Sequence, residues 1–266
     1  PALPLDYAVR AGADLTDVVI ENMQLQAIDF AGRQKRQARE DAAPNVSVIA
    51  VAEGDGMKAI FRELNCASII SGGAGCNPST EAIIGAIERV PAENVIVLPN
   101  HKDVVPAAEQ AAKLQTGKRV RVAPTSTMMQ GVSAMIAYGD ASEQEVDFKA
   151  MAEAMEAAGA GVISVQITRA TRPAKLNGLN ICEDDYIAIV DGAVSAAASD
   201  IERTLKDALS LTGINGKEIV TLYCGAEFDT ASAKELIESL SMTIKGIEFE
   251  AVYGGQALYP LLVSIE

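Results

Sequence analysis

The fold is decided by the stretch Ser68-Ile69-Ile70-Ser71-Gly72-Gly73-Ala74-Gly75-Cys76-Asn77-Pro78-Ser79-Thr80, in which a short apolar strand runs into a loop of small and polar residues before a helix from Glu81. The pattern recurs twice: the strand Val95–Leu98 precedes the loop Pro99–Asp103, and the strand Val120–Ala123 precedes the loop Pro124–Thr127. Repeats of strand, loop and helix form parallel sheets, and the loops that follow the strands share one edge. We therefore expect a binding site among the loops Gly72–Thr80, Pro99–Asp103 and Pro124–Thr127, which we call the loop edge.

Three segments are predicted along the chain. Residues 1–43 are expected to be a helical lead-in and linker, residues 44–140 a Rossmann-like α/β half, and residues 141–266 a second α/β half, with the boundary near Tyr138–Ser142. In the second half, Asp191-Gly192 between two apolar runs is typical of a hairpin turn. The predicted fold class is α/β, with a mostly parallel sheet and helices on both faces in the first half, and a mixed second half with antiparallel strands.

The composition limits the classes of partner. Apolar residues make up 49% of the 266 residues but aromatic residues only 4%, which suits an aliphatic core between helices and a parallel sheet. Acidic residues outnumber basic ones by 36 to 22, giving a formal net charge of −14 that opposes binding to nucleic acid or to an anionic membrane. The basic run Gly32–Arg39 is therefore interpreted as a solvated helix end or linker rather than a nucleic-acid patch.

The thiols and the absence of targeting signals predict the location. The four cysteines, Cys66, Cys76, Cys182 and Cys224, have neither CxxC nor metal-ligand spacing, so a reducing cytoplasm is expected. No apolar run approaches the roughly 20 residues of a membrane span, so no membrane insertion is expected. Because the chain begins at Pro1 rather than Met, we expect it to be a fragment of a longer protein.

The glycine-rich loop allows two interpretations. Gly72 and Gly73 let the backbone approach a ligand or a neighbouring protein closely, and Ser79 or Thr80 can cap the following helix. Free N–H groups at that helix would bind an anion, which keeps a small-anion-binding regulatory module as one alternative. Because GxGxxG and GK[ST] motifs are absent here, a structural turn or a protein contact surface that includes Asn77 is favoured.

Three further features are candidates for chemistry or binding. Cys76 and His101 follow consecutive strands and would form a nucleophile and its base if those strands are neighbours, which keeps a stand-alone enzyme as a second alternative. Arg169, at the end of a predicted strand, is suited to clamp a carboxylate of a partner, although a surface ion pair is the commoner role. Tyr259 lies in the Tyr253–Pro260 connection between two strands, and tyrosines often anchor protein interfaces.

Short motifs spread over residues 45–266 together resemble the C-terminal region of the fatty acid kinase A-subunit family, also described as dihydroxyacetone-kinase-like proteins. In chain order they are Val48–Gly56, Ser71–Gly73, Asn77–Glu81, Asn94–Asn100, Pro124-Thr125, Gln130-Gly131, Asp184–Tyr186, Val190–Gly192, and Tyr253–Gln256 continuing through Tyr259-Pro260 to Ile265-Glu266. Three runs depart from the family pattern. Gly72–Cys76 replaces Gly-Gly-Gln-Thr-Met, Asn100–Lys102 replaces Asn-Asn-Lys, and Thr168–Thr171 replaces Val-Arg-Asp-Thr.

The resemblance implies a division of labour between domains and subunits. Members of the family pair an ATP-binding N-terminal kinase domain with a middle domain and this C-terminal domain, and a separate fatty-acid-binding, DegV-like protein presents the acyl carboxylate for phosphorylation. By this resemblance the chain is a non-catalytic fragment that docks the fatty-acid-binding partner. No cofactor is expected in it, since ATP and Mg²⁺ belong to the kinase domain. A homodimer stays open as a further assembly. The partner-binding candidates are Gly72, Gly73, Asn77, Ser79, Thr80, Asn100, His101, Lys102, Thr125, Arg169 and Tyr259.

Overall fold

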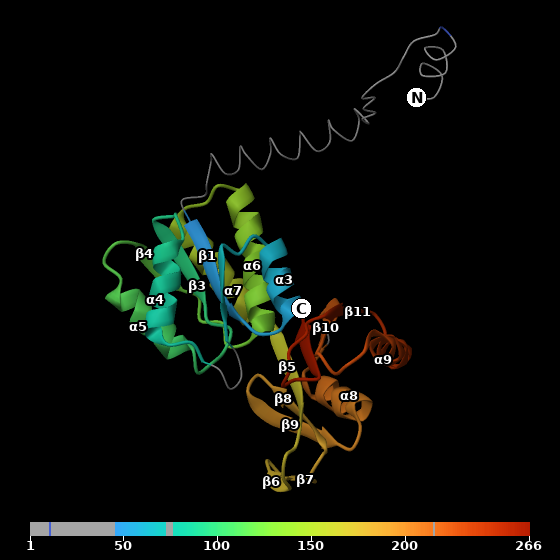
Figure 1. Cartoon of the computed structure of the whole chain (residues 1–266). Helices are drawn as coiled ribbons and strands as arrows, with labels where there is room; N and C mark the ends of the chain where they lie inside the picture. Colours follow the sequence, from blue (N-terminus) through green and yellow to red (C-terminus); the bar gives the residue numbers. More distant parts are fainter. Residues whose placement is uncertain (1–10, 12–45, 73–76, 215) are drawn as a thin grey trace. The chain divides into compact units, whose positions relative to one another are not determined.

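Four parallel strands form the sheet of the first half, in the order β2-β1-β3-β4 (Figure 1). The structure is a computed structural model that describes residues 11, 46–72, 77–214 and 216–266, so the predicted lead-in over residues 1–43 lies almost wholly outside the described residues. The strands are β1 (Val46–Ala52), β2 (Ser68–Ser71), β3 (Asn94–Leu98) and β4 (Arg119–Val122). All of β3 and nearly all of β1 are buried, because helices cover both faces of the sheet.

Two groups of helices cover the two faces, as predicted. One face packs on α4 (Thr80–Arg89) and α5 (Val105–Leu114), in a core that includes Ile49 and Val97. The other face packs on α3 (Asp55–Glu63), α6 (Met128–Glu143) and, beyond α6, α7 (Phe148–Ala160).

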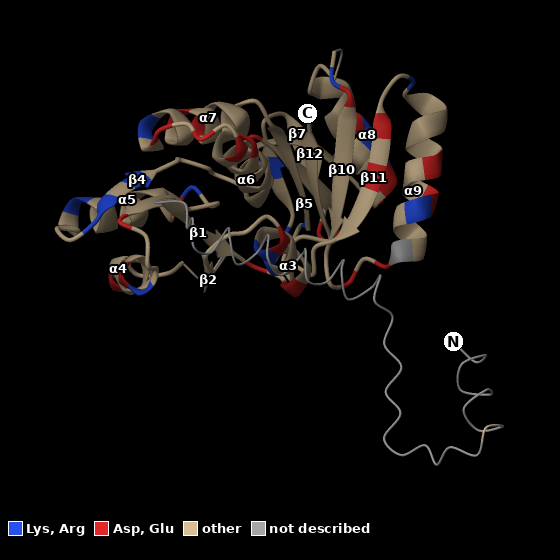
Figure 2. Cartoon of the chain, turned by 90° about the horizontal axis from the view of Figure 1, so that it is seen from above, with Lys and Arg blue, Asp and Glu red and all other residues tan. Residues whose placement is uncertain are grey.

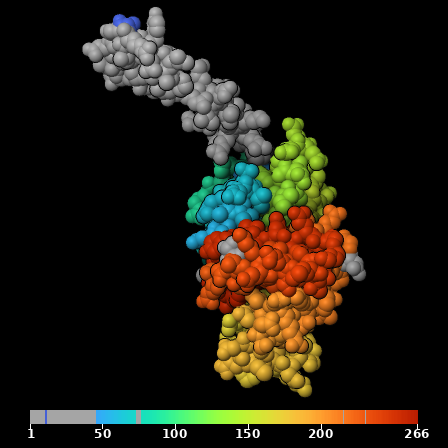
Figure 3. All heavy atoms as spheres, turned by 90° about the vertical axis from the view of Figure 1, so that its right-hand side faces the viewer, coloured from blue at the N-terminus to red at the C-terminus, as the bar shows by residue number. Residues whose placement is uncertain are grey.

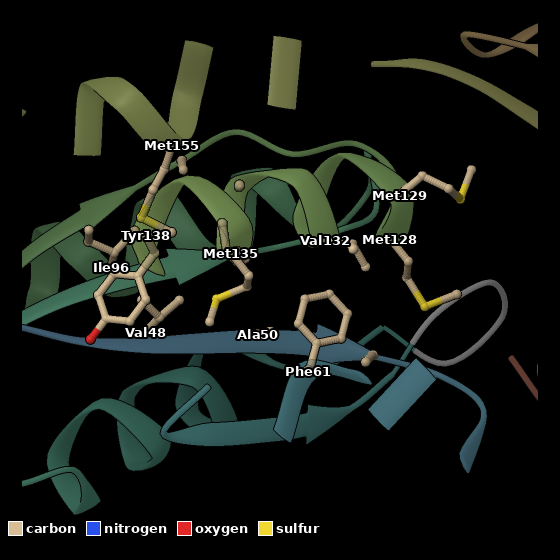
Figure 4. Close-up of a cluster of buried hydrophobic side chains, with 14 of the residues drawn as sticks. Val48, Ala50, Phe61, Ile96, Met128, Met129, Val132, Met135, Tyr138 and Met155 are labelled. Carbon is tan, nitrogen blue, oxygen red and sulfur yellow. The ribbon is translucent and has the colours of Figure 1, made fainter. Parts of the chain in front are cut away.

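Figure 4 shows the core on the side of α6. There Met135 and Tyr138 of α6 point toward β1, and Phe61 of α3 lies beside them. The Tyr138 hydroxyl also donates a hydrogen bond to the carbonyl oxygen of Val46, at 3.1 Å, so the helix is fixed along the strand.

The second half contains a mixed sheet of six strands in the order β11-β10-β12-β5-β8-β9. Only β10 and β11 pair in parallel, and the other neighbours pair antiparallel. Helices α8 and α9 cover one face, with Leu205 and Leu236 in the core between them and the sheet. The elements are β5 (Ile163–Arg169), β8 (Tyr186–Val190), β9 (Ala193–Ala198), α8 (Ile201–Leu211), β10 (Ile219–Cys224), α9 (Thr230–Thr243), β11 (Glu248–Tyr253) and β12 (Leu261–Ile265).

The two halves are joined backbone to backbone. The amide of Met57, in the first turn of α3, donates a hydrogen bond to the carbonyl oxygen of Gly254, at 2.9 Å. A Cβ atom at Gly54 or Gly56 would overlap the backbone of residues 253–256, so only glycine permits this approach. Tyr223 and Leu262 of the second sheet also belong to the core around α6. Residues 45–266 accordingly form one compact unit.

Two features differ from the sequence predictions. Helix α6 continues through Tyr138–Ser142, where a boundary was expected, because Tyr138 and Ala141 are buried in the core of the first half. The strands β6 (Ala174–Leu176) and β7 (Leu179–Ile181) form a separate hairpin that no pattern indicated. Figure 3 shows the gold end of the molecule, which holds this part of the chain, separated from the blue-green first half by the orange and red segments of the second half.

We expect Gly56→Ala to lower the free energy of unfolding by about 1–3 kcal/mol, because its methyl group would overlap the carbonyl oxygen of Tyr253. Gly85→Ala is the matched control, since Gly85 also lies in a helix but has no atom within 4 Å of an added Cβ. The control should raise the free energy of unfolding by up to about 1 kcal/mol. Urea denaturation measures both. Equal effects of the two substitutions would show that the close approach of the halves is not a constraint.

Candidate functional site

The parallel sheet brings the ends of β2, β3 and β4 to one edge, as the sequence predicts. Because β2, β1, β3 and β4 all run in one direction, the segments that follow them share one edge of the sheet. Gly72 is buried against this edge, and Gly73 and Cys76 lie outside the described residues. The predicted pairing of Cys76 with His101 therefore stays a prediction.

Polar side chains on the outer side of the loop edge are open to solvent. Asn77, Ser79 and Lys102 are exposed, and Thr80 and His101 are half-buried. The Ser79 hydroxyl accepts the amide of Ala82 at 3.2 Å, so this residue is the N-cap of α4.

His101 is held by its own loop. Its Nδ1 atom accepts the amide of Asp103 at 3.3 Å and lies 3.8 Å from Oδ2 of the same residue. Because Nδ1 accepts that hydrogen bond, Nε2 is the nitrogen that can donate. The exposed ammonium group of the neighbouring Lys102 adds a positive charge at the same point.

Asn100 and Thr125 are buried beneath the loop edge, with 4% and 3% of their surfaces exposed. The Asn100 amide nitrogen Nδ2 donates to the carbonyl oxygen of Val51 at 2.9 Å, and its Oδ1 accepts the Thr125 hydroxyl at 2.7 Å. The backbone N–H of Asn100 donates to the same hydroxyl oxygen at 3.1 Å. Both residues were predicted to contact a ligand or a partner, and this contact stays a prediction, since both side chains are buried here and bonded within the chain.

The inner side of the loop edge is occupied by the second half of the molecule. The hydroxyl groups of Thr127 and Ser164 lie 2.8 Å apart, both buried. Gln130 folds back so that its Oε1 accepts the amide of Ser126 at 2.7 Å. Asn77, Ser79 and Lys102, on the outer side of the loop edge, stay exposed.

The Tyr253–Pro260 connection adjoins the loop edge. Its Gly254 contacts the first turn of α3 directly after β1, and the negative charge of Glu53 reaches Tyr259. Burial, and secondarily that charge, raises the pKa of the half-buried Tyr259. Tyr253 and Leu258 in the same connection are 57% and 50% exposed. Two candidate locations that the sequence could not relate are thus neighbours.

Arg169 lies close to this connection but already has a partner. Its guanidinium donates to the Tyr186 hydroxyl at 2.6 Å and lies 4.6 Å from the centre of that ring. The adjacent Thr168 hydroxyl donates to the carbonyl oxygen of Leu258 at 3.2 Å, which brings the end of β5 to the connection. Clamping of a partner carboxylate by Arg169 would therefore compete with its contact to Tyr186.

Gln256 was not singled out by sequence reasoning, although it is 1% exposed and structurally central. Its Nε2 donates to the carbonyl oxygen of Tyr223 at 2.8 Å, while no partner is found for Oε1 among the described residues. A polar side chain directly after Gly254-Gly255 was the available signal, because glycines let a neighbouring residue turn inward.

The described residues contain no group of three or more His, Cys, Asp or Glu side chains placed to hold a metal ion. None of the helices in this part of the chain combines the length and the apolar character that crossing a membrane requires. Carboxylates are frequent on α9 and β11 of the second half, as Figure 2 shows in red.

Comparisons with known proteins give a sequence match and a fold match. The family of fatty acid kinase A-subunit-like proteins, in its C-terminal part, matches residues 47–266. Protein YloV of Bacillus subtilis is 31% identical over 269 residues, and an uncharacterized protein of Staphylococcus epidermidis is 29% identical over 271 residues. Each alignment covers 100% of this chain and 48% of the relative, so the chain spans about half the length of these relatives.

The solved structures with a similar fold have low sequence identity. A DegV family protein of Corynebacterium glutamicum superposes with a TM-score of 0.59 at 17% identity, covering 83% of this chain and 96% of that one. The fatty acid kinase B3 protein of Streptococcus pneumoniae, loaded with linoleic acid, gives 0.55 at 10% identity, over 83% and 99%. The dihydroxyacetone kinase of C. freundii gives 0.53 at 12% identity, over 83% and 48%.

The thiols provide a test of the buried structure around the site. Burial raises the pKa of Cys66 and of Cys224 to about 11, from an ordinary value of 9.0, whereas Cys182 is exposed. At pH 8 such a shift lowers the thiolate fraction about 100-fold, and the thiolate is the reactive form. In a Cys76→Ser background we expect a disulfide reagent to label Cys182 at least about 100-fold faster than either buried thiol. Labelling of Cys66 as fast as that of Cys182 would contradict the burial described here.

Proposed function

Because the chain belongs to the C-terminal family of fatty acid kinase A-subunit-like proteins, we propose that it is the docking domain of a larger kinase protein. In this role it holds a fatty-acid-binding protein so that the acyl carboxylate can be phosphorylated elsewhere in the complex. The chain covers 48% of the relatives' length, which leaves room in such proteins for a separate catalytic domain. ATP and Mg²⁺ would be bound by that domain.

One observation carries the proposal: the buried polar groups of the loop edge are bonded within the chain, whereas its exposed polar groups stand on loops at the end of a parallel sheet. Its inner polar groups, those of Asn100, Thr125 and Thr127, are used in bonds within the chain. Its outer side chains, such as Asn77 and Lys102, are exposed on loops held by a rigid sheet. Loops on a rigid scaffold are the usual location of protein-binding residues.

The partner that fits this proposal is a fatty-acid-binding protein of the DegV family. Solved DegV proteins from Thermus thermophilus and Bacillus subtilis bind fatty acids, and both share the fold of this chain. We propose that the docking surface comprises the exposed part of the loop edge and the Tyr253–Pro260 connection. Lys102 would supply charge complementarity, and Tyr253 with Leu258 would supply apolar contact area. An acidic protein with unpaired thiols fits a cytoplasmic complex of this kind.

We expect Lys102→Glu and Leu258→Ser each to weaken binding to a DegV-family protein from the same genome, loaded with oleic acid, by about three- to tenfold. The charge reversal should act mainly on the association rate and should lose its effect at high salt. The serine substitution should act on the dissociation rate, because it removes apolar contact. Surface plasmon resonance at two salt concentrations separates the two effects.

Lys113→Glu and Leu114→Ser are the matched controls. Both side chains are exposed at the end of α5, which lies at the edge of the sheet opposite the loop edge, and Leu114 is 58% exposed. The controls should bind the partner as the unchanged protein does. If the controls weaken binding and Lys102→Glu and Leu258→Ser do not, the docking surface lies at the opposite edge of the sheet and the proposal is wrong.

A second prediction concerns catalysis. The isolated chain, mixed with the loaded DegV-family protein, Mg²⁺ and ATP, should form no acyl phosphate, because phosphoryl transfer needs groups that hold Mg-ATP in place and this proposal assigns them to another domain. Addition of the remaining half of the parent protein should restore the reaction. Transfer from [γ-³²P]ATP measures the product. Formation of acyl phosphate by the chain alone would favour an enzyme over a docking domain.

A further inference from the structure

Asn100 lies where an open parallel sheet usually binds its ligand. In the order β2-β1-β3-β4, the connections leave β1 in one direction and return to β3 on its other side. The ends of β1 and β3 therefore flank the topological switch point, where loops diverge and leave a crevice. Here the Asn100 side chain bridges the two strands, because its Nδ2 bonds the carbonyl oxygen of Val51, at 2.9 Å. The Asn100 amide is buried at this point and is bonded within the chain.

The same residue also ties the loop after β4 to the ends of β1 and β3. Its backbone N–H and its Oδ1 both meet the Thr125 hydroxyl, at 3.1 and 2.7 Å, and that hydroxyl belongs to the loop after β4. Thr125 Cγ2 in turn packs toward Gly159 at the end of α7. One asparagine and one threonine thus join the ends of β1, β3 and β4.

The backbone at Asn100 favours asparagine over most residues with a side chain. Its φ angle is +54°, in the left-handed region that asparagine tolerates better than other residues with a side chain. Gly131 in α6 makes room for the amide, since a Cβ there would overlap Oδ1. The positive φ of Asn100 and the glycine at position 131 both accommodate one buried amide. This amide directly precedes His101 and Lys102 of the proposed docking surface.

We infer that Asn100 is the positioning residue of the docking surface. It presets the His101–Asp103 loop and the Pro124–Ser126 loop in the conformation that the partner meets, without contacting the partner itself. The inference rests on the proposed function for its partner. The bonds of Asn100 to Val51 and Thr125, which we call the clamp, can be tested without a partner. When the loop is already in the binding conformation, no binding free energy is lost in selecting a minor conformation. Loss of the clamp therefore lowers the affinity in proportion to the fraction of molecules whose loop still has the binding conformation.

Two pairs of variants test the inference. Asn100→Gly keeps the left-handed backbone and removes both side-chain bonds. Thr125→Val keeps the shape of the side chain and removes the hydroxyl, whereas Thr125→Ser keeps the hydroxyl and should rescue the clamp. We expect Asn100→Gly and Thr125→Val to weaken binding of the oleate-loaded DegV-family protein by at least about tenfold, and Thr125→Ser to leave it within about twofold.

Hydrogen–deuterium exchange provides the readout that needs no partner. Exchange in the peptide covering residues 99–104 should speed up at least about tenfold in Asn100→Gly and Thr125→Val. Leu205→Ala serves as the control for lost stability, because Leu205 is a residue of α8 that is buried in the core of the second half. It should lower the melting temperature at least as far as Asn100→Gly and Thr125→Val do. It should leave unchanged both the affinity for the DegV-family protein and the exchange of this peptide.

The outcomes separate the two proposals. If the unchanged protein fails to bind any DegV-family protein of its genome, docking is overturned, and the exchange data alone decide the clamp. If binding is intact but Asn100→Gly and Thr125→Val weaken it no more than Leu205→Ala does, the positioning role is overturned. Unchanged exchange in residues 99–104 would overturn the clamp whatever the affinity.

Discussion

The close approach of two glycine-containing backbones is the constraint on which the molecule depends. Gly54 and Gly56 at the start of α3 meet the segment Tyr253–Gln256, and the Met57 amide bonds the Gly254 carbonyl. That carbonyl takes the position of an acceptor at the N-terminus of α3, where no side chain caps the helix. One contact thus completes a helix, joins two sheets and brings the Tyr253–Pro260 connection beside the loop edge.

In this packing, the polar side chains fall into two groups: buried ones that bond within the chain, and exposed ones on the loops. Buried asparagine, threonine, serine and glutamine side chains bond to one another or to the backbone, and the Thr127–Ser164 contact joins the two halves. Such networks fix the relative position of the elements that supply them, because a broken bond would leave a buried polar group without a partner. The fold shared with DegV proteins and dihydroxyacetone kinase is compatible with different roles.

The sequence predicts the parallel sheet well because β1 and β3 are continuous apolar runs followed by turn residues. It misses the hairpin of β6 and β7, since strands of three residues show no periodicity. It also cannot tell that Asn100 points inward while Lys102 points outward, because both are polar residues of one loop. The acceptor that decides the matter, Val51, is 49 residues away in the chain. Local patterns locate loops, but the direction of a polar side chain depends on distant partners.

The position of β12 has a consequence for the order in which the protein can fold during synthesis. This strand, the last of the described elements, lies between β10 and β5 and pairs with both. Until Leu261–Ile265 has left the ribosome, the strands on its two sides have no neighbour to join them, and β5 and β10 keep one open edge each. The first sheet needs no such late segment. Translation therefore imposes a waiting period on half of the molecule, during which β5 and β10 each present an unpaired edge that a chaperone can bind.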